Sequence, residues 1–112
     1  MRTEEFLITL DEEMLEYFRD MADVLVERCG ISRAEAVARL NERYAGKEMS
    51  PLEQGLMGHE FPEFWAYGVY YYPDEKGRLP VGDAVADADI DFARLRVRPA
   101  PPKDSPFWTL DE

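Results

Sequence analysis

Two amphipathic segments, joined by only two residues, constrain the fold of this chain most strongly. Apolar side chains recur every three or four positions in residues 11–29 and again in residues 32–44, which is the spacing of an α-helix. Ser32 and Glu35 form a capping box at the start of the second segment. Because only Gly30 and Ile31 separate the segments, we expect a helical hairpin of neighbouring helices.

Local signals predict where the first helix begins and ends. Thr9 and Glu12 have the spacing of a capping box at its start, and Gly30 is a typical residue just after a helix. Cys29 falls on the apolar side of this helix. We therefore interpret Cys29 as a core residue and not as a reactive thiol.

Two further helices are predicted after the hairpin. Ser50 followed by a proline and an acid is a start signal, and Gly58 limits this helix to a short one. Aromatic residues then follow at helical spacing over residues 62–71, and Pro73 ends that helix. We expect the inward side of this aromatic helix to contain Phe61, Phe64 and Trp65, although residues 69–72 also have strand propensity.

The fold class that we predict is mostly α, with at most a minor β element near residues 92–98, where apolar and charged residues alternate. Its strand partner would be residues 5–8 or 69–72, and an α+β fold is the alternative. We expect a single globular domain in residues 1–98. The proline-rich residues 99–112 form an extended tail, whose Phe107–Trp108 segment docks on the domain or on a partner.

The charge of the chain favours a basic protein as its partner. There are 24 acidic and 13 basic residues, a net charge of −11. Nucleic acids and anionic membranes require a basic surface, so neither is expected as a partner. A basic protein would be attracted by the field of this chain, although many soluble proteins are simply acidic. A lone cysteine and the absence of an apolar leader or membrane-spanning segment in this sequence lead us to expect a cytoplasmic location.

The most regular polar feature is a row of acids on the first helix. They fall within an arc of roughly 80°, and we name them the acidic stripe: Glu12, Glu16, Asp20, Asp23 and Glu27. The stripe is either a solvated helix face or a docking face for a basic surface. The aromatic helix has more tyrosines than one short helix can bury, and tyrosine and tryptophan are common anchors at interfaces. We therefore predict that Tyr67, Tyr70 and Trp108 join the stripe in contacting a partner.

Two motifs resemble metal or catalytic sites without completing them. His59, Glu60 and Glu63 lack the second histidine of a zinc-protease helix, and Pro62 interrupts the turn. A second set, Asp87, Asp89 and Asp91, begins like a calcium loop but lacks its later glycine and glutamate. We expect no cofactor and no catalysis. A small metal-binding protein or enzyme that uses either set is the alternative.

One stretch resembles a known family. Residues 59–66, followed by Tyr70-Tyr71-Tyr72, look like the His-Glu-x-Pro-x-x-Trp-Ala signature of small bacterial proteins that often occur as immunity proteins beside polymorphic toxins. Residues 31–44 are similar to the helix that precedes that signature, so the likeness spans about residues 30–72. The resemblance implies a protein that binds and neutralises a toxin domain without catalysis. The nature of the toxin and the oligomeric state stay open.

Overall fold

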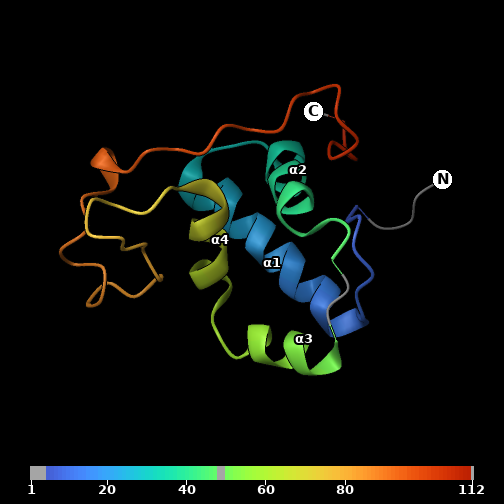
Figure 1. Cartoon of the computed structure of the whole chain (residues 1–112), viewed down its shortest axis with the longest axis horizontal. Coiled ribbons are helices and arrows are strands. Elements are labelled where there is room, and N and C mark those ends of the chain that lie inside the picture. The colour runs from blue at the N-terminus through green and yellow to red at the C-terminus, as the bar shows by residue number, and fades with distance from the viewer. Residues whose placement is uncertain (1–4, 48–49, 112) are drawn as a thin grey trace.

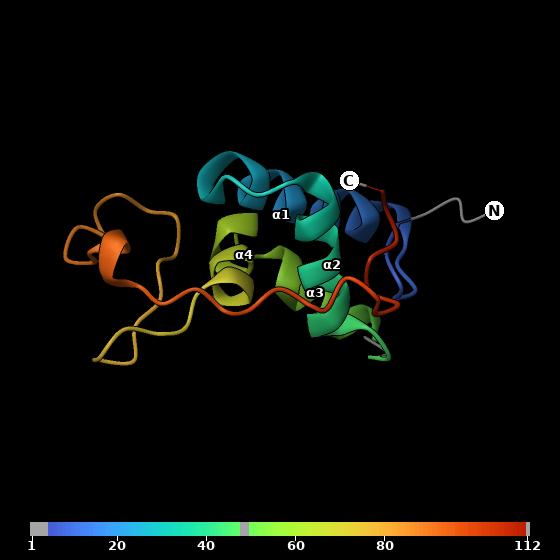
Figure 2. The same cartoon turned by 90° about the horizontal axis from the view of Figure 1, so that it is seen from above.

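Four α-helices form the regular structure of this computed structural model, which describes residues 5–47 and 50–111. They are α1 (Glu12–Cys29), α2 (Arg33–Tyr44), α3 (Pro51–Gly58) and α4 (Pro62–Tyr70), and a short 3₁₀ turn follows at Phe92–Arg94. Helix α1 lies along one side of the molecule, and the other three helices pack on its opposite side (Figures 1 and 2). The predicted mostly α fold is confirmed.

Helix α1 begins at Glu12, which confirms the predicted start near residue 11, but its cap differs from the predicted one. The Asp11 carboxylate accepts a hydrogen bond from the Met14 N–H (2.8 Å), so Asp11 is the N-cap and the expected Thr9–Glu12 box is wrong. The reason lies just upstream, where Phe6 and Ile8 are buried and the chain runs non-helically into the core. Asp11 is then placed to cap the free N–H groups of the first turn. The helix ends before Gly30, as predicted.

The start signals of the next two helices are confirmed. The Ser32 hydroxyl accepts from the Glu35 N–H (3.1 Å) at the start of α2. Ser50 accepts from the Glu53 N–H (3.2 Å), and the Glu53 carboxylate accepts in return from the Ser50 N–H (3.5 Å). Each cap satisfies N–H groups that have no partner within the helix.

Helices α1 and α2 supply most of the core. Phe18, Met21 and Leu25 of α1 and Leu40 of α2 are fully buried. Phe18 also meets the Tyr44 ring edge-on, with 5.2 Å between centroids. Fully burying a side chain of this kind contributes roughly 1.5–3 kcal/mol relative to leaving it exposed, so these residues contribute a large share of the stability of the fold.

The inward face of α4 differs from the prediction. Ala66, Tyr67 and Val69 are buried, whereas Phe61 is exposed and Trp65 is only partly buried. Phe64 lies just on the exposed side, so the expectation that Phe61, Phe64 and Trp65 are all inside is wrong. The fully buried Ala66 allows α4 to pack closely on the core, which turns the larger rings toward the rim.

The predicted strand at residues 92–98 is reduced to a single bridge. Its first residues form the 3₁₀ turn, and only Val97 pairs, in antiparallel fashion, with Tyr71. The Tyr72 N–H donates to the Arg96 carbonyl (2.9 Å) and the Arg98 N–H to the Tyr70 carbonyl (2.8 Å). Of the two proposed partners, residues 69–72 are therefore the ones that pair. No strand forms in the described residues, because nothing extends this pair into a ladder.

Residues 99–111 cross α2 and return toward the beginning of the chain (Figure 1). The side-chain amide of Asn41 donates to the Phe107 carbonyl (3.0 Å), and the Thr109 hydroxyl donates to the Glu5 carbonyl. Covered by α1 on one side and by this tail on another, α2 is buried even at Arg39 and Asn41. The apolar periodicity of this helix does not by itself indicate the burial of Arg39.

Candidate protein-binding surface

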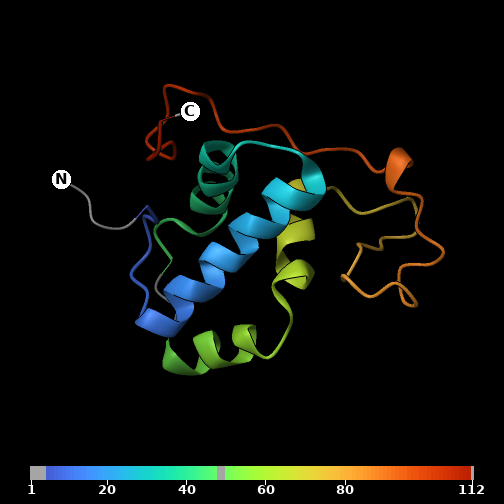
Figure 3. The same cartoon turned by 180° about the vertical axis from the view of Figure 1, so that it is seen from behind.

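All five carboxylates of the acidic stripe lie on exposed positions of α1. Helix α1 is the nearest helix in Figure 3, where its outward face is free of other helices. Among the ion pairs of the described residues, one involves the stripe, between Asp23 and Arg33 at the start of α2. The stripe is thus available to solvent, and Asp23 also ties α1 to α2.

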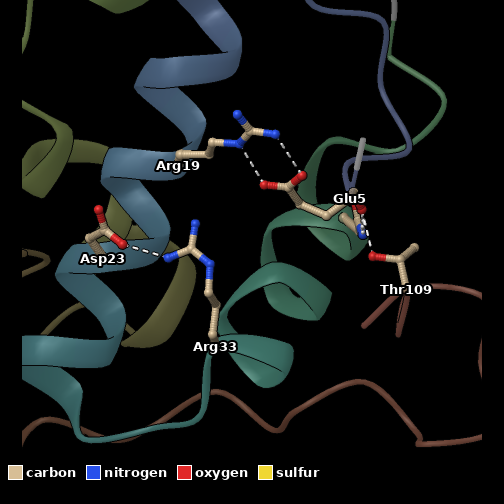
Figure 4. A network of polar contacts seen from close by, with 6 residues as sticks. Glu5, Arg19, Asp23, Arg33 and Thr109 are labelled. Atoms are coloured by element: carbon tan, nitrogen blue, oxygen red, sulfur yellow. Dashed lines mark hydrogen bonds and ion pairs between the residues drawn. The ribbon is translucent and has the colours of Figure 1, made fainter. Parts of the chain in front are cut away.

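A second ion pair lies beside the stripe (Figure 4). The Arg19 guanidinium donates twice to the Glu5 carboxylate, at 2.8 and 3.1 Å, and the Thr109 hydroxyl donates to the Glu5 backbone carbonyl. The hydrogen bonds from Arg19 hold the pKa of the Glu5 carboxyl below its usual range, against a smaller opposing effect of burial. Glu5 therefore fixes the chain before α1, and its charge is neutralised within the fold.

The three predicted aromatic contacts have different surroundings. Tyr67 is only 3% exposed, because its ring packs against Tyr71 and Phe92. Its hydroxyl accepts a hydrogen bond from the Arg28 guanidinium (3.3 Å). The prediction that Tyr67 lies on a partner-binding surface is therefore corrected. Tyr70 is half-buried under the Arg39 guanidinium, 4.7 Å from its ring centroid. Burial raises the pKa of the Tyr70 hydroxyl.

Trp108 is partly buried within the tail itself. Its indole N–H donates to the Pro101 carbonyl (2.9 Å), and the Lys103 ammonium lies 5.3 Å from its ring centroid. These contacts close the tail on itself. Its role in binding a partner stays a prediction.

Several large apolar side chains are exposed elsewhere, on α3 and at the start of α4. Leu52 is 72% exposed, Leu56 60% and Phe61 75%, and Phe64 lies on the same part of the chain. We name these four residues the apolar patch. Sequence analysis missed it because the aromatic residues were assigned to the core. The available signal was Leu52 and Leu56, which are spaced i, i+4 on a helix with no other element predicted to cover it.

A groove of about 440 Å³ runs beside the patch, between α3, α4 and the end of α2. Apolar residues form most of its lining, and the only charged residues among the lining are Glu53 and Glu60. The full lining is Tyr44, Glu53, Leu56, Met57, Glu60, Phe64 and Trp65. None of these residues belongs to α1, so the groove is separate from the acidic stripe.

The chain that forms the groove is held in place by hydrogen bonds. The Tyr17 hydroxyl of α1 lies 3.0 Å from the Met57 carbonyl and 2.7 Å from the Glu60 carbonyl. The Trp65 indole N–H also donates to the Met57 carbonyl (3.0 Å). Burial is the main cause that raises the pKa of the Tyr17 hydroxyl to about 12. The hydroxyl therefore stays protonated and keeps its hydrogen-bond donor throughout the physiological pH range.

The two metal-site alternatives have other roles in the structure. His59 follows α3 as its exposed C-cap, with Glu60 exposed beside it and Glu63 on α4. The Asp87 carboxylate accepts from the N–H groups of Val81 and Gly82, both at 2.9 Å.

The other two acids of that motif are exposed. Asp91 caps the 3₁₀ turn, and no hydrogen bond or ion pair is found for Asp89 in the described structure. Within residues 5–47 and 50–111, no three His, Cys, Asp or Glu side chains are grouped closely enough to hold a metal ion.

Cys29 is half-buried, and burial raises the pKa of its thiol to about 11. Such a thiol carries almost no thiolate near neutral pH and is a poor nucleophile.

The chain matches no protein-family model, no curated protein and no solved structure. None of the described helices is both long and apolar enough to span a membrane.

Proposed function

We propose that this chain is an acidic immunity-type protein, which binds a basic toxin domain and neutralises it by protein–protein contact without catalysis. The observation that carries the proposal is the apolar patch, where Leu52, Leu56 and Phe61 are largely exposed. Large apolar side chains gathered on a surface typically mark an interaction site. The patch lies within residues 30–72, the stretch that resembles bacterial immunity proteins.

The acidic stripe supports the choice of a basic partner. Its five exposed carboxylates stand on a chain of net charge −11, so the field around α1 is negative. Such a field speeds the encounter with a positively charged protein, and its effect falls as salt shortens the screening length. The stripe would act on the rate of association, while the apolar patch would supply contact area.

The test is to purify this protein with a basic toxin domain encoded next to it, and to measure complex formation and relief of toxicity. Association rates are then compared for a triple variant of the stripe, Glu12→Lys, Glu16→Lys and Asp20→Lys. Asp23 is left intact because it pairs with Arg33. We expect at least about tenfold slower association for this variant at low salt, and little difference at high salt.

The matched control changes the net charge equally but away from the stripe. Glu75→Lys, Asp89→Lys and Asp104→Lys alter three exposed acids outside the helices. Equal slowing by both triple variants would show that net charge alone acts. A protein that neither binds the toxin domain nor relieves its toxicity would refute the proposed function.

A further inference from the structure

We infer that the groove between α3 and α4 receives an amphipathic helix of the partner, whose buried face carries large apolar side chains and whose flanks carry Lys or Arg. The inference rests on the proposed function and deepens it, because it names the surface and the chemistry of the segment that is bound. It differs from the sequence-based prediction, which placed the contact on the acidic stripe, Tyr67, Tyr70 and Trp108.

The size and lining of the groove suit apolar side chains. The groove has a volume of about 440 Å³ and is open to solvent, so it can seat side chains laid across it. Tyr44, Met57 and Trp65 contribute apolar surface, and the exposed side chains of Leu56 and Phe64 extend it toward the patch. An inserted Leu or Phe would therefore contact apolar atoms on several sides.

The groove offers a partner apolar side-chain contacts and few free backbone hydrogen-bonding groups. The Met57 carbonyl already accepts from the Trp65 indole N–H, and the single Tyr17 hydroxyl hydrogen is shared between the Met57 and Glu60 carbonyls. A peptide that binds as an added β-strand needs a free strand edge, and the described residues contain one isolated bridge and no strand. A helix satisfies its own backbone groups and needs only apolar contact, so it is the occupant that this surface fits.

The charges around the groove exclude a second copy of the chain as the favoured occupant. The groove is lined by Glu53 and Glu60, and residues 48–75 contain no Lys or Arg. Lys47 lies at the other end, with its ammonium 5.8 Å from the Tyr44 ring centroid. A twofold dimer through this face would bring the same carboxylates together, since each copy presents the same surface. Basic residues flanking the apolar face of a partner helix would instead meet these carboxylates with opposite charge.

The probe is a fluorescein-labelled synthetic peptide of about 18 residues, long enough to form a helix. It carries Leu and Phe at positions i, i+3, i+4 and i+7 and Lys elsewhere. A twin peptide has Glu in place of every Lys, and a third has the Lys peptide's composition in scrambled order. Binding to the full chain is measured by fluorescence anisotropy. We expect the Lys peptide to bind and the other two to bind at least about tenfold more weakly.

Variants of the protein assign the binding to the groove and the adjoining apolar patch, since Leu56 lines the groove and Phe61 belongs to the patch. The double variant Leu56→Ser and Phe61→Ser should weaken binding of the Lys peptide roughly 30-fold, as expected for loss of a dominant contact. Val85→Ser is the matched control, because Val85 is 86% exposed in the loop after α4 and lies outside the groove. It should change the affinity less than twofold. Glu60→Lys should weaken the Lys peptide and strengthen its Glu twin.

Several results would overturn the inference. The first is that none of the three peptides binds, or that all three bind equally. The second is that the Leu56 and Phe61 substitutions leave the affinity for the Lys peptide unchanged. The third is that the protein sediments as a dimer and that Leu56→Ser converts it to a monomer. Tighter binding of a proline-rich peptide would assign an extended occupant instead. The inference alone fails if the double variant still neutralises the toxin domain fully. The proposed function alone fails if the Lys peptide binds as expected and no toxin domain is neutralised.

Discussion

Replacing Asn41 tests how the two ends of the described chain are held on the helices. This side chain is 1% exposed and makes three hydrogen bonds to backbone groups. Its carbonyl oxygen accepts from the Leu7 N–H (2.8 Å), and its amide donates to the carbonyls of Glu5 (3.2 Å) and Phe107 (3.0 Å). Asn41→Ala removes all three hydrogen bonds at once.

The expected loss follows from the number of hydrogen bonds. Each contributes about 0.5–1.5 kcal/mol net, so three contribute about 3 kcal/mol. A backbone group that stays buried without a partner costs about 1–3 kcal/mol, so the loss of stability is expected to exceed the net value of the hydrogen bonds alone. We expect the free energy of unfolding to fall by about 3–4 kcal/mol. For a domain whose total stability is about 5–15 kcal/mol, this is a large fraction.

Urea denaturation followed by circular dichroism measures the effect. With a slope of about 1–3 kcal/mol per molar urea, the midpoint should fall by at least about 1 M. Thr109→Val, which removes the hydroxyl bonded to the Glu5 carbonyl, should cost about 1 kcal/mol. The double variant should lose less than the sum, because a tail released by Asn41→Ala no longer places Thr109. A loss below about 1 kcal/mol for Asn41→Ala would refute this account.

Three further changes test other parts of the structure. Gly82→Ala should lower the free energy of unfolding, measured in urea, by roughly 1–3 kcal/mol, because the φ of Gly82 is 89° and an added Cβ would lie 2.5 Å from the Glu63 Cβ. Gly77→Ala is the control and should cost less, since Gly77 has a φ of 77° but open space around it. A larger loss for Gly77→Ala would contradict this reasoning. The pKa of the Glu5 carboxyl is lowered in the fold, so the stability that this carboxylate contributes is complete above its unfolded pKa near 4.5 and is lost as pH falls through its folded pKa. Glu5→Gln should therefore lower the thermal stability at pH 7 and hardly change it at pH 2–3. An equal loss at both pH values would show that the ionised carboxylate is not the source of the stability. Burial raises the pKa of the Cys29 thiol to about 11. Iodoacetamide should therefore alkylate the folded protein at pH 8 roughly a hundredfold more slowly than the urea-unfolded chain. Similar rates for the two would show that the Cys29 thiol is not protected in the fold.

Helix boundaries were predictable from the sequence because the signals that set them are local. Ser32 and Ser50 cap the helices that follow them, since a cap involves atoms only three residues apart. The same locality explains the error at α1. The sequence pattern favoured Thr9 as the cap, and the use of Asp11 instead depends on the burial of Phe6 and Ile8 against helices distant in the sequence.

The burial of polar residues in α2 could not be predicted from periodicity. Arg39 is buried because its guanidinium pairs with Glu35 (2.8 Å), donates to the Arg98 carbonyl (2.7 Å) and stacks on Tyr70. Two of these three partners lie far away in the sequence, so no local pattern shows them. Asn41 is a similar case, with backbone partners that are 34 to 66 residues away.

The candidate site was predicted in part. The acidic stripe is exposed as expected, because charged side chains at one helical phase stay in water unless they are paired. The apolar patch was missed because hydrophobicity alone does not decide which side of α4 faces the core. Ala66 and Val69 are buried there, while Phe61 remains outside. Shape decides this, since a small side chain allows closer approach of two helices.

The hydrogen bonds of Asn41 and Thr109 also set the order in which this chain can complete its fold. A ribosome that has synthesised residues 1–98 has made the residues of all four helices, yet the amide of Asn41 still lacks the Phe107 carbonyl and the Glu5 carbonyl lacks Thr109. Contacts across 66 and 104 residues cannot form until those later residues emerge. Until then this side of Asn41 stays open to water, and docking of residues 99–111 closes it.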